Sequence, residues 1–280
     1  MKEQSIKLVA LDYDGTLAQP NSKVAEAEVA ALKQLGEKQI VRVVATGRSL
    51  FSADEVMKSE LPIDYLVFSS GVGVMHWKSR EIIHRNDLNV ELATHLIADL
   101  HRRKLNFMVH HPVPDNHMFY YHKSDKNAPD FERRISIYKA FARPFEKDLI
   151  FTGISQLLII VGDVNEGLKH LSDLRVAYPE LNVVRTTSPL DNNSMWIEIF
   201  PKHVSKASGI QFLANKYGFN SKGIVCVGND FNDLDMLNYA GAAYVVDNAP
   251  NELKTKFNCI PANHEGGVAQ LLTRIIHACV

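Results

Sequence analysis

The chain contains few cysteines, no long apolar segment and no excess of either charge, and each absence excludes a class of protein. Its 280 residues include three scattered cysteines, Cys226, Cys259 and Cys279. An odd, dispersed set indicates no disulfide framework and favours the reducing cytoplasm. The 31 Lys and Arg residues balance 32 Asp and Glu residues, so charge does not indicate nucleic acid or a membrane surface as a partner. No apolar run approaches the ~18 residues of a membrane-spanning helix, and the N-terminus shows no signal-peptide core.

The chain does contain alternating strand and helix patterns, and its 46% of hydrophobic residues can fill a sizeable core. Apolar runs at Ile6–Leu11 and Ile40–Ala45 are typical of buried strands, and the spacing in Val24–Lys38 is typical of an amphipathic helix. Such alternation favours a parallel sheet with crossover helices. We therefore expect an α/β fold with a Rossmann-like, doubly wound parallel sheet at its core.

The pattern changes in the middle of the chain, which indicates a second, smaller α/β module. Polar stretches at Asn86–Asn89 and Thr186–Asn193 are the expected crossings between the two modules. The first pattern resumes towards the C-terminus. We predict a discontinuous core domain, residues 1–86 and 187–280, with residues 87–186 inserted between its halves.

The first strand ends in two aspartates, Asp12 and Asp14, followed by Gly15 and Thr16. Charge at the edge of a core is costly unless a metal, a basic group or a reaction offsets it. The arrangement suits a strand tip that holds Mg²⁺ with one carboxylate as a nucleophile. An ordinary Asp-Gly turn is the alternative.

Two further motifs stand at the ends of predicted elements. Thr46-Gly47-Arg48 follows an apolar strand, where ligands bind in open α/β sheets. The Thr46 hydroxyl and the Gly47 backbone N–H can hold a phosphate oxygen there, although an ordinary turn also fits. Lys206 stands at the start of a predicted helix, where a cation is unfavourable unless an anion lies nearby. A solvated lysine is the alternative.

The fourth motif is rich in acid and amide side chains. A predicted strand stops at Gly228, and the next five residues include Asn229, Asp230, Asn232 and Asp233. Capping the following helix needs one such residue, not four. Two or more of their oxygens would complete an oxygen-rich Mg²⁺ site with Asp12.

In this order and context, the four motifs resemble those of the haloacid dehalogenase superfamily. The chain is most similar to its Cof-type phosphatases, which are related to sucrose-phosphatase-like enzymes. Those enzymes carry an α/β cap domain between the second and third motifs, where this chain has residues 87–186. The tail segments Val246–Pro250 and His264–Val268 also resemble the Cof-type ending. The resemblance spans the whole chain in outline and is weakest in the cap, which would cover the site and select the substrate.

The resemblance implies a role for each matched residue. Asp12 would be the nucleophile that takes the phosphoryl group as an aspartyl-phosphate. Asp14 would protonate the leaving oxygen, deprotonate the hydrolytic water and offer its backbone carbonyl to Mg²⁺. The residues that would bind the phosphate are Thr46, Gly47, Lys206, Asn232 and Asn248.

The chain departs from the common form of the fourth motif, in which Asp follows Gly directly. Here that residue is Asn229, and Asp230 comes next. We expect Asp12, Asp14, Asn229 and Asp233 to hold Mg²⁺; in the alternative, the loop shifts and Asp230 coordinates. One fewer negative ligand would weaken Mg²⁺ binding.

The resemblance implies a Mg²⁺-dependent phosphomonoester hydrolase that acts on a small phosphorylated metabolite, with sugar phosphates as the favoured class. The alternatives are a phosphomutase or phosphotransferase, which passes the phosphate to a second hydroxyl, and a non-catalytic metabolite-binding protein. A cytoplasmic monomer or homodimer is expected.

Overall fold

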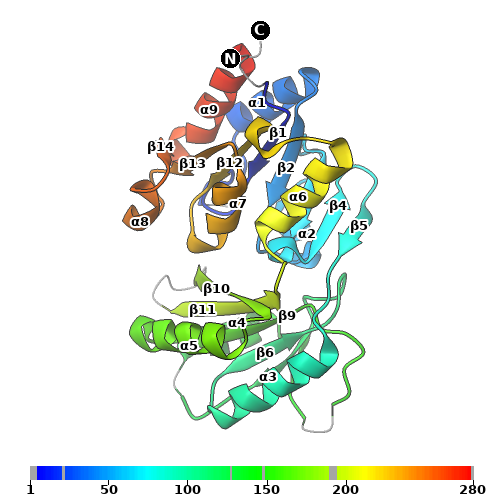
Figure 1. The fold of residues 1–280 in the computed structure, drawn as a ribbon, viewed down its shortest axis with the longest axis vertical. Helices are drawn as coiled ribbons and strands as arrows, with labels where there is room; N and C mark the ends of the chain where they lie inside the picture. Colours follow the sequence, from blue (N-terminus) through cyan, green and yellow to red (C-terminus); the bar gives the residue numbers. More distant parts are fainter. Residues whose placement is uncertain (1–4, 21–22, 127, 147–148, 189–193, 279–280) are drawn as a thin grey trace. The chain divides into compact units, whose positions relative to one another are not determined.

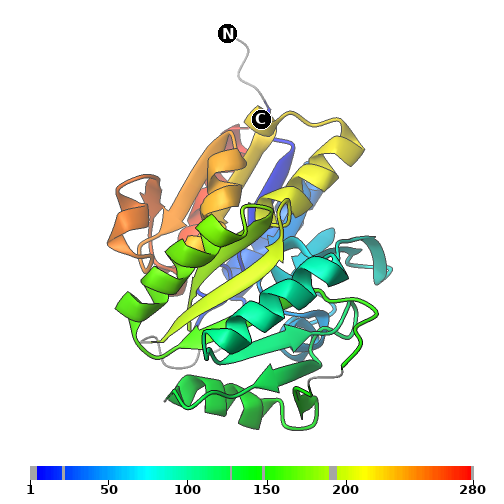
Figure 2. The ribbon, with the colours of Figure 1, turned by 60° about the horizontal axis from the view of Figure 1, so that its bottom comes forward.

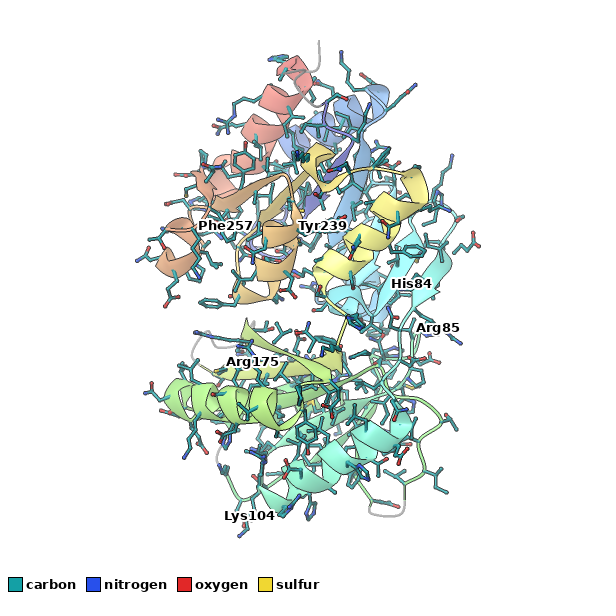
Figure 3. All side chains as sticks on the ribbon, viewed as in Figure 1. His84, Arg85, Lys104, Arg175, Tyr239 and Phe257 are labelled. Carbon is teal, nitrogen blue, oxygen red and sulfur yellow. The ribbon has the colours of Figure 1, made fainter. Side chains whose placement is uncertain are left out.

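A computed structural model describes residues 5–20, 23–126, 128–146, 149–188 and 194–278 (Figure 1). The chain divides into two compact units. The first unit combines Met1–His84 with Ser205–Val280, and the second is Arg85–Val204. His84 and Arg85, both labelled in Figure 3, therefore mark the first crossing from one unit to the other.

Within the described residues, the first unit is built on an eight-stranded sheet in the order β14-β13-β12-β1-β2-β3-β4-β5. The central strand β1 (Leu8–Leu11) lies parallel to β12 (Ile224–Gly228) on one side and to β2 (Val41–Ala45) on the other. The remaining strands are β3 (Tyr65–Phe68), β4 (Gly73–His76), β5 (Glu81–Arg85), β13 (Ala242–Val246) and β14 (Asn258–Ile260).

Strands β3, β13 and β14 continue the parallel pairing on both sides of β1, whereas β4 runs antiparallel to β3. The carboxyl ends of the parallel strands therefore share one edge of the sheet. Strand order reverses at β1, which is where open α/β sheets bind their ligands. The predicted α/β class with a parallel core sheet is confirmed.

Helices cover both faces of this sheet, as a doubly wound fold requires (Figure 1). Helix α1 (Glu26–Glu37) packs against α9 (Gly267–Ala278), and α6 (Lys206–Tyr217) packs against α7 (Leu234–Tyr239). The shorter helices are α2 (Leu50–Val56) and α8 (Asn251–Lys254). Figure 3 labels Tyr239, at the end of α7, and Phe257, before β14, which pack at the margin of the core under α6 and α7.

The second unit has its own sheet, which runs β10-β11-β9-β6-β7-β8 in the described part of the chain. Its strands are β6 (Phe107–His110), β7 (Phe119–His122), β8 (Ala142–Pro144), β9 (Gln156–Val161), β10 (Leu181–Thr187) and β11 (Met195–Pro201). Helices α3 (Val90–Arg102) and α5 (Val164–Ala177) cover one face and share its core (Figure 2). Helix α4 (Pro129–Ile137) packs on the other face.

The second crossing differs from the boundary predicted at residue 187. Strand β11 lies in the second unit because it pairs with β9 and β10 along its length. The boundary predicted at residue 187 would have assigned this strand to the core domain. Residues 189–193 of the predicted polar crossing lie outside the described residues. No helix in the described part of the chain has the length and apolar character needed to cross a bilayer.

Candidate active site

The sheet brings the predicted motifs to one edge. Asp12 is the first residue after β1, and its N–H donates to the carbonyl of Val227 in β12 at 2.9 Å. Thr46 follows β2 and donates its N–H to Val67 in β3 at 2.8 Å. Asn229 directly follows β12. Because these strands are parallel, their following residues meet although they are far apart in sequence.

Lys206 forms a buried ionic cluster with two carboxylates. Its Nζ donates to Asp12 Oδ1 at 2.6 Å and to Asp233 Oδ1 at 2.7 Å. The residues are 1% (Lys206), 4% (Asp12) and 0% (Asp233) exposed. These carboxylates are the anions that explain a lysine in the first turn of α6, whose backbone is capped by Ser205.

Burial shapes the titration of this cluster. Desolvation raises the pKa of Asp12 to about 7; the Lys206 ammonium opposes this rise, and the Asp233 carboxylate adds to it. Desolvation also lowers the pKa of Lys206, but the two carboxylates outweigh it and the net shift is upward. Lys206 therefore stays charged, and Asp12 is the group of this pair that titrates near neutrality.

Asp233 organises the fourth motif through both of its oxygens. Besides Lys206, it accepts hydrogen bonds at Oδ2 from the backbone N–H groups of Asn229 at 2.8 Å and Asp230 at 3.0 Å. Gly228 is required here because a Cβ would lie 2.6 Å from the Asp233 carboxylate. The role of Asp233 as a metal ligand stays a prediction; its position holds Lys206 and the loop.

The Asn229 carboxamide lies among three acceptors at the tip of β1. The terminal amide atom that faces these acceptors, called the inner atom below, is 3.1 Å from Asp12 Oδ2, 3.1 Å from the Asp14 carbonyl oxygen and 3.2 Å from Thr16 Oγ1. With nitrogen at this position, the amide donates to these groups. With oxygen there, Thr16 donates to it and the other two contacts join oxygens. The structure thus brings Asn229 to Asp12, whereas the Asp230 carboxylate accepts from the N–H of Phe231.

This set of oxygens fits Mg²⁺. Among the described residues, no three His, Cys, Asp or Glu side chains are arranged to hold a metal ion. A cation at this edge would therefore use the Asp14 carbonyl and the Asn229 amide oxygen beside the Asp12 carboxylate. Hard oxygen ligands of these types suit Mg²⁺, and this set carries little negative charge.

Arg48 forms a bidentate ion pair with Asp14, the residue predicted to transfer the proton. Its Nε and Nη2 donate to the two carboxylate oxygens of Asp14 at 2.7 and 2.8 Å, and its Nη1 donates to the Ser52 carbonyl in α2 at 3.3 Å. This fork fixes the plane of an exposed carboxylate. The sequence analysis assigned roles to Thr46 and Gly47 of the motif Thr46-Gly47-Arg48 but none to Arg48, because nothing in the local sequence links Arg48 to Asp14.

The other predicted phosphate-binding groups lie at the ends of β2 and β12. Thr46 is fully buried, and its Oγ1 accepts from the N–H of Arg48 at 3.1 Å. A Cβ on Gly47 would lie 3.5 Å from Ser70 Oγ and 3.7 Å from Asn232 Nδ2. Gly47, Ser70 and Asn232 are thus neighbours, and their role in phosphate binding stays a prediction.

Three successive residues after β3 have positive φ: Ser69 at 48°, Ser70 at 54° and Gly71 at 99°. Such a conformation is costly for serine and persists where the surroundings impose it. A Cβ on Gly71 would lie 2.0 Å from the Ser205 carbonyl, so this turn presses against the start of the helix that carries Lys206. The sequence of Ser69-Ser70-Gly71 is compatible with a plain turn or with a contact to the substrate, and the contact with the substrate stays a prediction.

Asn248 supports the loop that follows β1. Its Nδ2 donates to the Gly15 carbonyl at 2.8 Å, and its Oδ1 accepts from the N–H of Asn263 at 3.1 Å. The Asn263 side chain in turn donates to the Ala18 carbonyl at 2.8 Å. Both ends of the Asn248 amide therefore bond within the protein, and the predicted contact with phosphate stays untested.

Comparison with known proteins places this geometry in context. The profile of the haloacid dehalogenase-like hydrolases matches residues 9–272. A Haemophilus influenzae protein with a provisional phosphatase name is 26% identical, over 95% of this chain and 97% of its own. A solved phosphatase of this superfamily from Bacteroides thetaiotaomicron superposes with a TM-score of 0.78 at 20% identity, covering 100% of this chain and 97% of that one. A solved subclass IIB sugar phosphatase gives 0.75 at 17% identity, with coverage of 98% and 100%.

Proposed function

The chain belongs to the haloacid dehalogenase-like hydrolase family, and we propose that it is a Mg²⁺-dependent phosphomonoester hydrolase working through an aspartyl-phosphate. The observation that carries the proposal is the Asp12 carboxylate, which is buried at a strand tip between the Lys206 ammonium and the Asn229 amide. A buried carboxylate held in place by a cation at a strand tip is suited to act as a nucleophile.

Asp12 attacks the phosphorus atom and forms the bond to it as the bond to the leaving oxygen breaks. Lys206 stays charged beside Asp12 and offsets the negative charge that a phosphoryl group brings to this carboxylate. The oxygens of Asp12, Asp14 and Asn229 would hold Mg²⁺, with Asp233 as a further predicted ligand, and the bound ion would supply further charge neutralisation to the phosphoryl group.

Asp14 gives a proton to the leaving oxygen and then takes one from the water that hydrolyses the aspartyl-phosphate. In the structure both of its oxygens accept from Arg48, so one of these hydrogen bonds must break when Asp14 donates. The Arg48 fork sets where the carboxylate stands before that step. Thr46, Gly47 and Asn232 would orient the phosphoryl oxygens, and Asn248 would assist them through the loop it supports.

The substrate we propose is a small phosphorylated metabolite, with sugar phosphates as the favoured class. A sugar phosphatase shares the fold, and the second unit corresponds in sequence position to the cap that selects substrates in the resembling enzymes. The cysteine content supports a cytoplasmic setting, and we propose a monomer or homodimer.

Phosphate release from a broad panel of phosphorylated metabolites, with Mg²⁺ present, tests the function. We expect turnover of at least one sugar phosphate and, in Asp12→Asn, a loss of kcat on the order of 10³-fold or more. Asp235→Asn, an exposed change on α7, is the matched control and should keep full activity. Full activity in Asp12→Asn would contradict the mechanism.

The same assay separates the alternatives. Transfer of phosphate to a second hydroxyl instead of water would identify a phosphomutase or phosphotransferase. Tight binding of a sugar phosphate without turnover would identify a metabolite-binding protein.

A further inference from the structure

We propose that the Asn229 carboxamide takes the place of the divalent cation when none is bound, and turns over to become its ligand when one enters. The inference rests on the proposed function only in assuming that a cation binds at the Asp12 tip. In addition to binding the cation, Asn229 would then hold Asp12 and the Asp14 carbonyl together by hydrogen bonds when no metal is bound.

The inner atom of the Asn229 amide lies close to two groups that cannot donate a hydrogen bond. The Asp12 carboxylate and the Asp14 carbonyl can only accept hydrogen bonds, and each lies 3.1 Å from that atom. An amide nitrogen at this position donates to both, as a cation would attract both. The opposite end of the amide then also finds suitable partners, since the atoms around it are donors.

The surroundings leave room for the amide to turn, but its outer end, which faces donors, then presents nitrogen to them, and the contact with the cation must offset that. Rotation by half a turn exchanges an oxygen for a nitrogen of nearly equal size, so it needs no new space. Gly15 allows the close fit, because a Cβ there would lie 2.5 Å from the amide nitrogen. The Thr16 hydroxyl accepts from the nitrogen in one orientation and donates to the oxygen in the other.

The anchor of the residue is the same in both orientations. The backbone N–H of Asn229 donates to Asp233 Oδ2 at 2.8 Å, and this contact does not involve the amide. Asp233 also holds Lys206 at 2.7 Å. Turning the amide therefore leaves the Lys206 cluster in place.

An aspartate at position 229 would behave differently. Its carboxylate cannot donate, so it would stand against the Asp12 carboxylate and the Asp14 carbonyl as a further acceptor. A bound cation, or a proton on one of the two carboxylates, would relieve that repulsion. The asparagine thus gives a site that is stable without metal and binds metal weakly, because the cation must replace hydrogen bonds that already exist.

Cation binding and thermal unfolding of chelator-treated full-length proteins, without substrate, test the inference. We expect Asn229→Asp to unfold at a lower Tm than the wild type when metal is absent. Its Kd for Mg²⁺ by calorimetry should be at least ~10-fold lower, and Mg²⁺ should raise its Tm more. Asn258→Asp, an exposed change on β14 that adds the same charge, is the control and should match the wild type.

Equal metal-free Tm values, equal Mg²⁺ affinities, or no Mg²⁺ binding by either protein would overturn the inference. If Asn229→Asp does not fold even with Mg²⁺, Asn229→Ala tests the same role, because alanine removes the amide donors without adding charge. It should lower the metal-free Tm without tightening Mg²⁺ binding, and a wild-type Tm would refute the role. None of these measurements involves phosphate release. Their outcome therefore tests the role of Asn229 independently of whether the protein is a phosphatase.

Discussion

Replacing Lys206 by Met removes the ammonium group that pairs with Asp12 and Asp233. The methionine keeps most of the volume of the side chain. Two buried carboxylates, 4% and 0% exposed, then face each other's charge without the ammonium that now lies 2.6 and 2.7 Å from them. We expect this substitution to destabilise the first unit strongly and in a pH-dependent way.

The magnitude follows from the burial of the cluster. Removing one partner of a buried ion pair costs about 3–5 kcal/mol, because it leaves an uncompensated charge in the interior. The loss approaches that range towards pH 8, where Asp12 is more ionised than near pH 5. Near pH 5 a proton can replace the lost cation, so we expect a loss of less than ~2 kcal/mol.

The sign of the pH dependence follows from the pKa of Asp12. Burial raises it from 3.8 to about 7, so Asp12 adds stability that is fully present below about pH 4 and is lost as pH rises through 7. Lys206 opposes this rise. Without Lys206 the pKa moves further up, and the loss extends to higher pH. The difference between wild type and variant therefore grows from pH 5 to pH 8.

Tryptophan fluorescence during urea unfolding measures the effect in the correct unit. The chain has two tryptophans: Trp77 lies in the first unit and Trp196 in the second. In a Trp196→Phe background, used for all variants, Trp77 alone reports the first unit, where it is 3% exposed. The free energy of unfolding is compared near pH 5 and near pH 8.

Lys216→Met provides the matched control, since Lys216 is exposed in the last turn of the same helix. It should cost no more than about 1 kcal/mol, with little pH dependence. A loss below ~1 kcal/mol in Lys206→Met, or an equal loss at both pH values, would refute the view that the cluster is held by charge compensation.

Three further predictions concern Arg48, Gly71 and Asn248. Arg48→Lys loses the fork that positions Asp14, so kcat for alkyl phosphates, whose leaving oxygen needs a proton, should fall by ~10²-fold or more. kcat for p-nitrophenyl phosphate should fall far less, and equal losses would contradict the positioning role. Gly71→Ala combines a φ of 99° with a Cβ 2.0 Å from the Ser205 carbonyl and should cost about 2–4 kcal/mol in urea unfolding. Gly218→Ala, at a φ of 68° with no heavy atom within 4 Å, should cost only about 1 kcal/mol; similar losses would show that the Ser205 contact is unimportant. Asn248→Ala removes two hydrogen bonds of the loop and should cost about 1–3 kcal/mol with KM unchanged; a KM that rises without loss of stability would indicate a phosphate contact instead.

Local patterns predicted most strands and helices because burial and periodicity act within a few residues. Strand β10 was missed, since Asn182, Arg185 and Thr186 interrupt its apolar pattern. It forms because β11 offers a partner along its whole length. The start of α2 likewise depends on a side-chain contact: Ser49 accepts from the N–H of Ser52, so the helix begins at Leu50.

The candidate site was predictable in its residue types but not in its contacts. Acid, amide and hydroxyl groups at strand ends predicted phosphate chemistry, because polar residues directly after buried strands must lie at the sheet edge. The pairing of Arg48 with Asp14 and the strained turn at Ser70 left no comparable pattern. Both depend on loops whose approach is set by the sheet and not by neighbouring residues.

By itself the sequence determined the α/β class, the order of the four motifs and the unusual asparagine at position 229, since each is a matter of local residue type and spacing. Only the tertiary structure decided that Lys206 meets Asp12 across 194 positions and that Asn229 meets Thr16 across 213. The physical reason is that parallel pairing around β1 fixes which distant strand ends become neighbours. Burial at that edge then decides which charges must compensate one another.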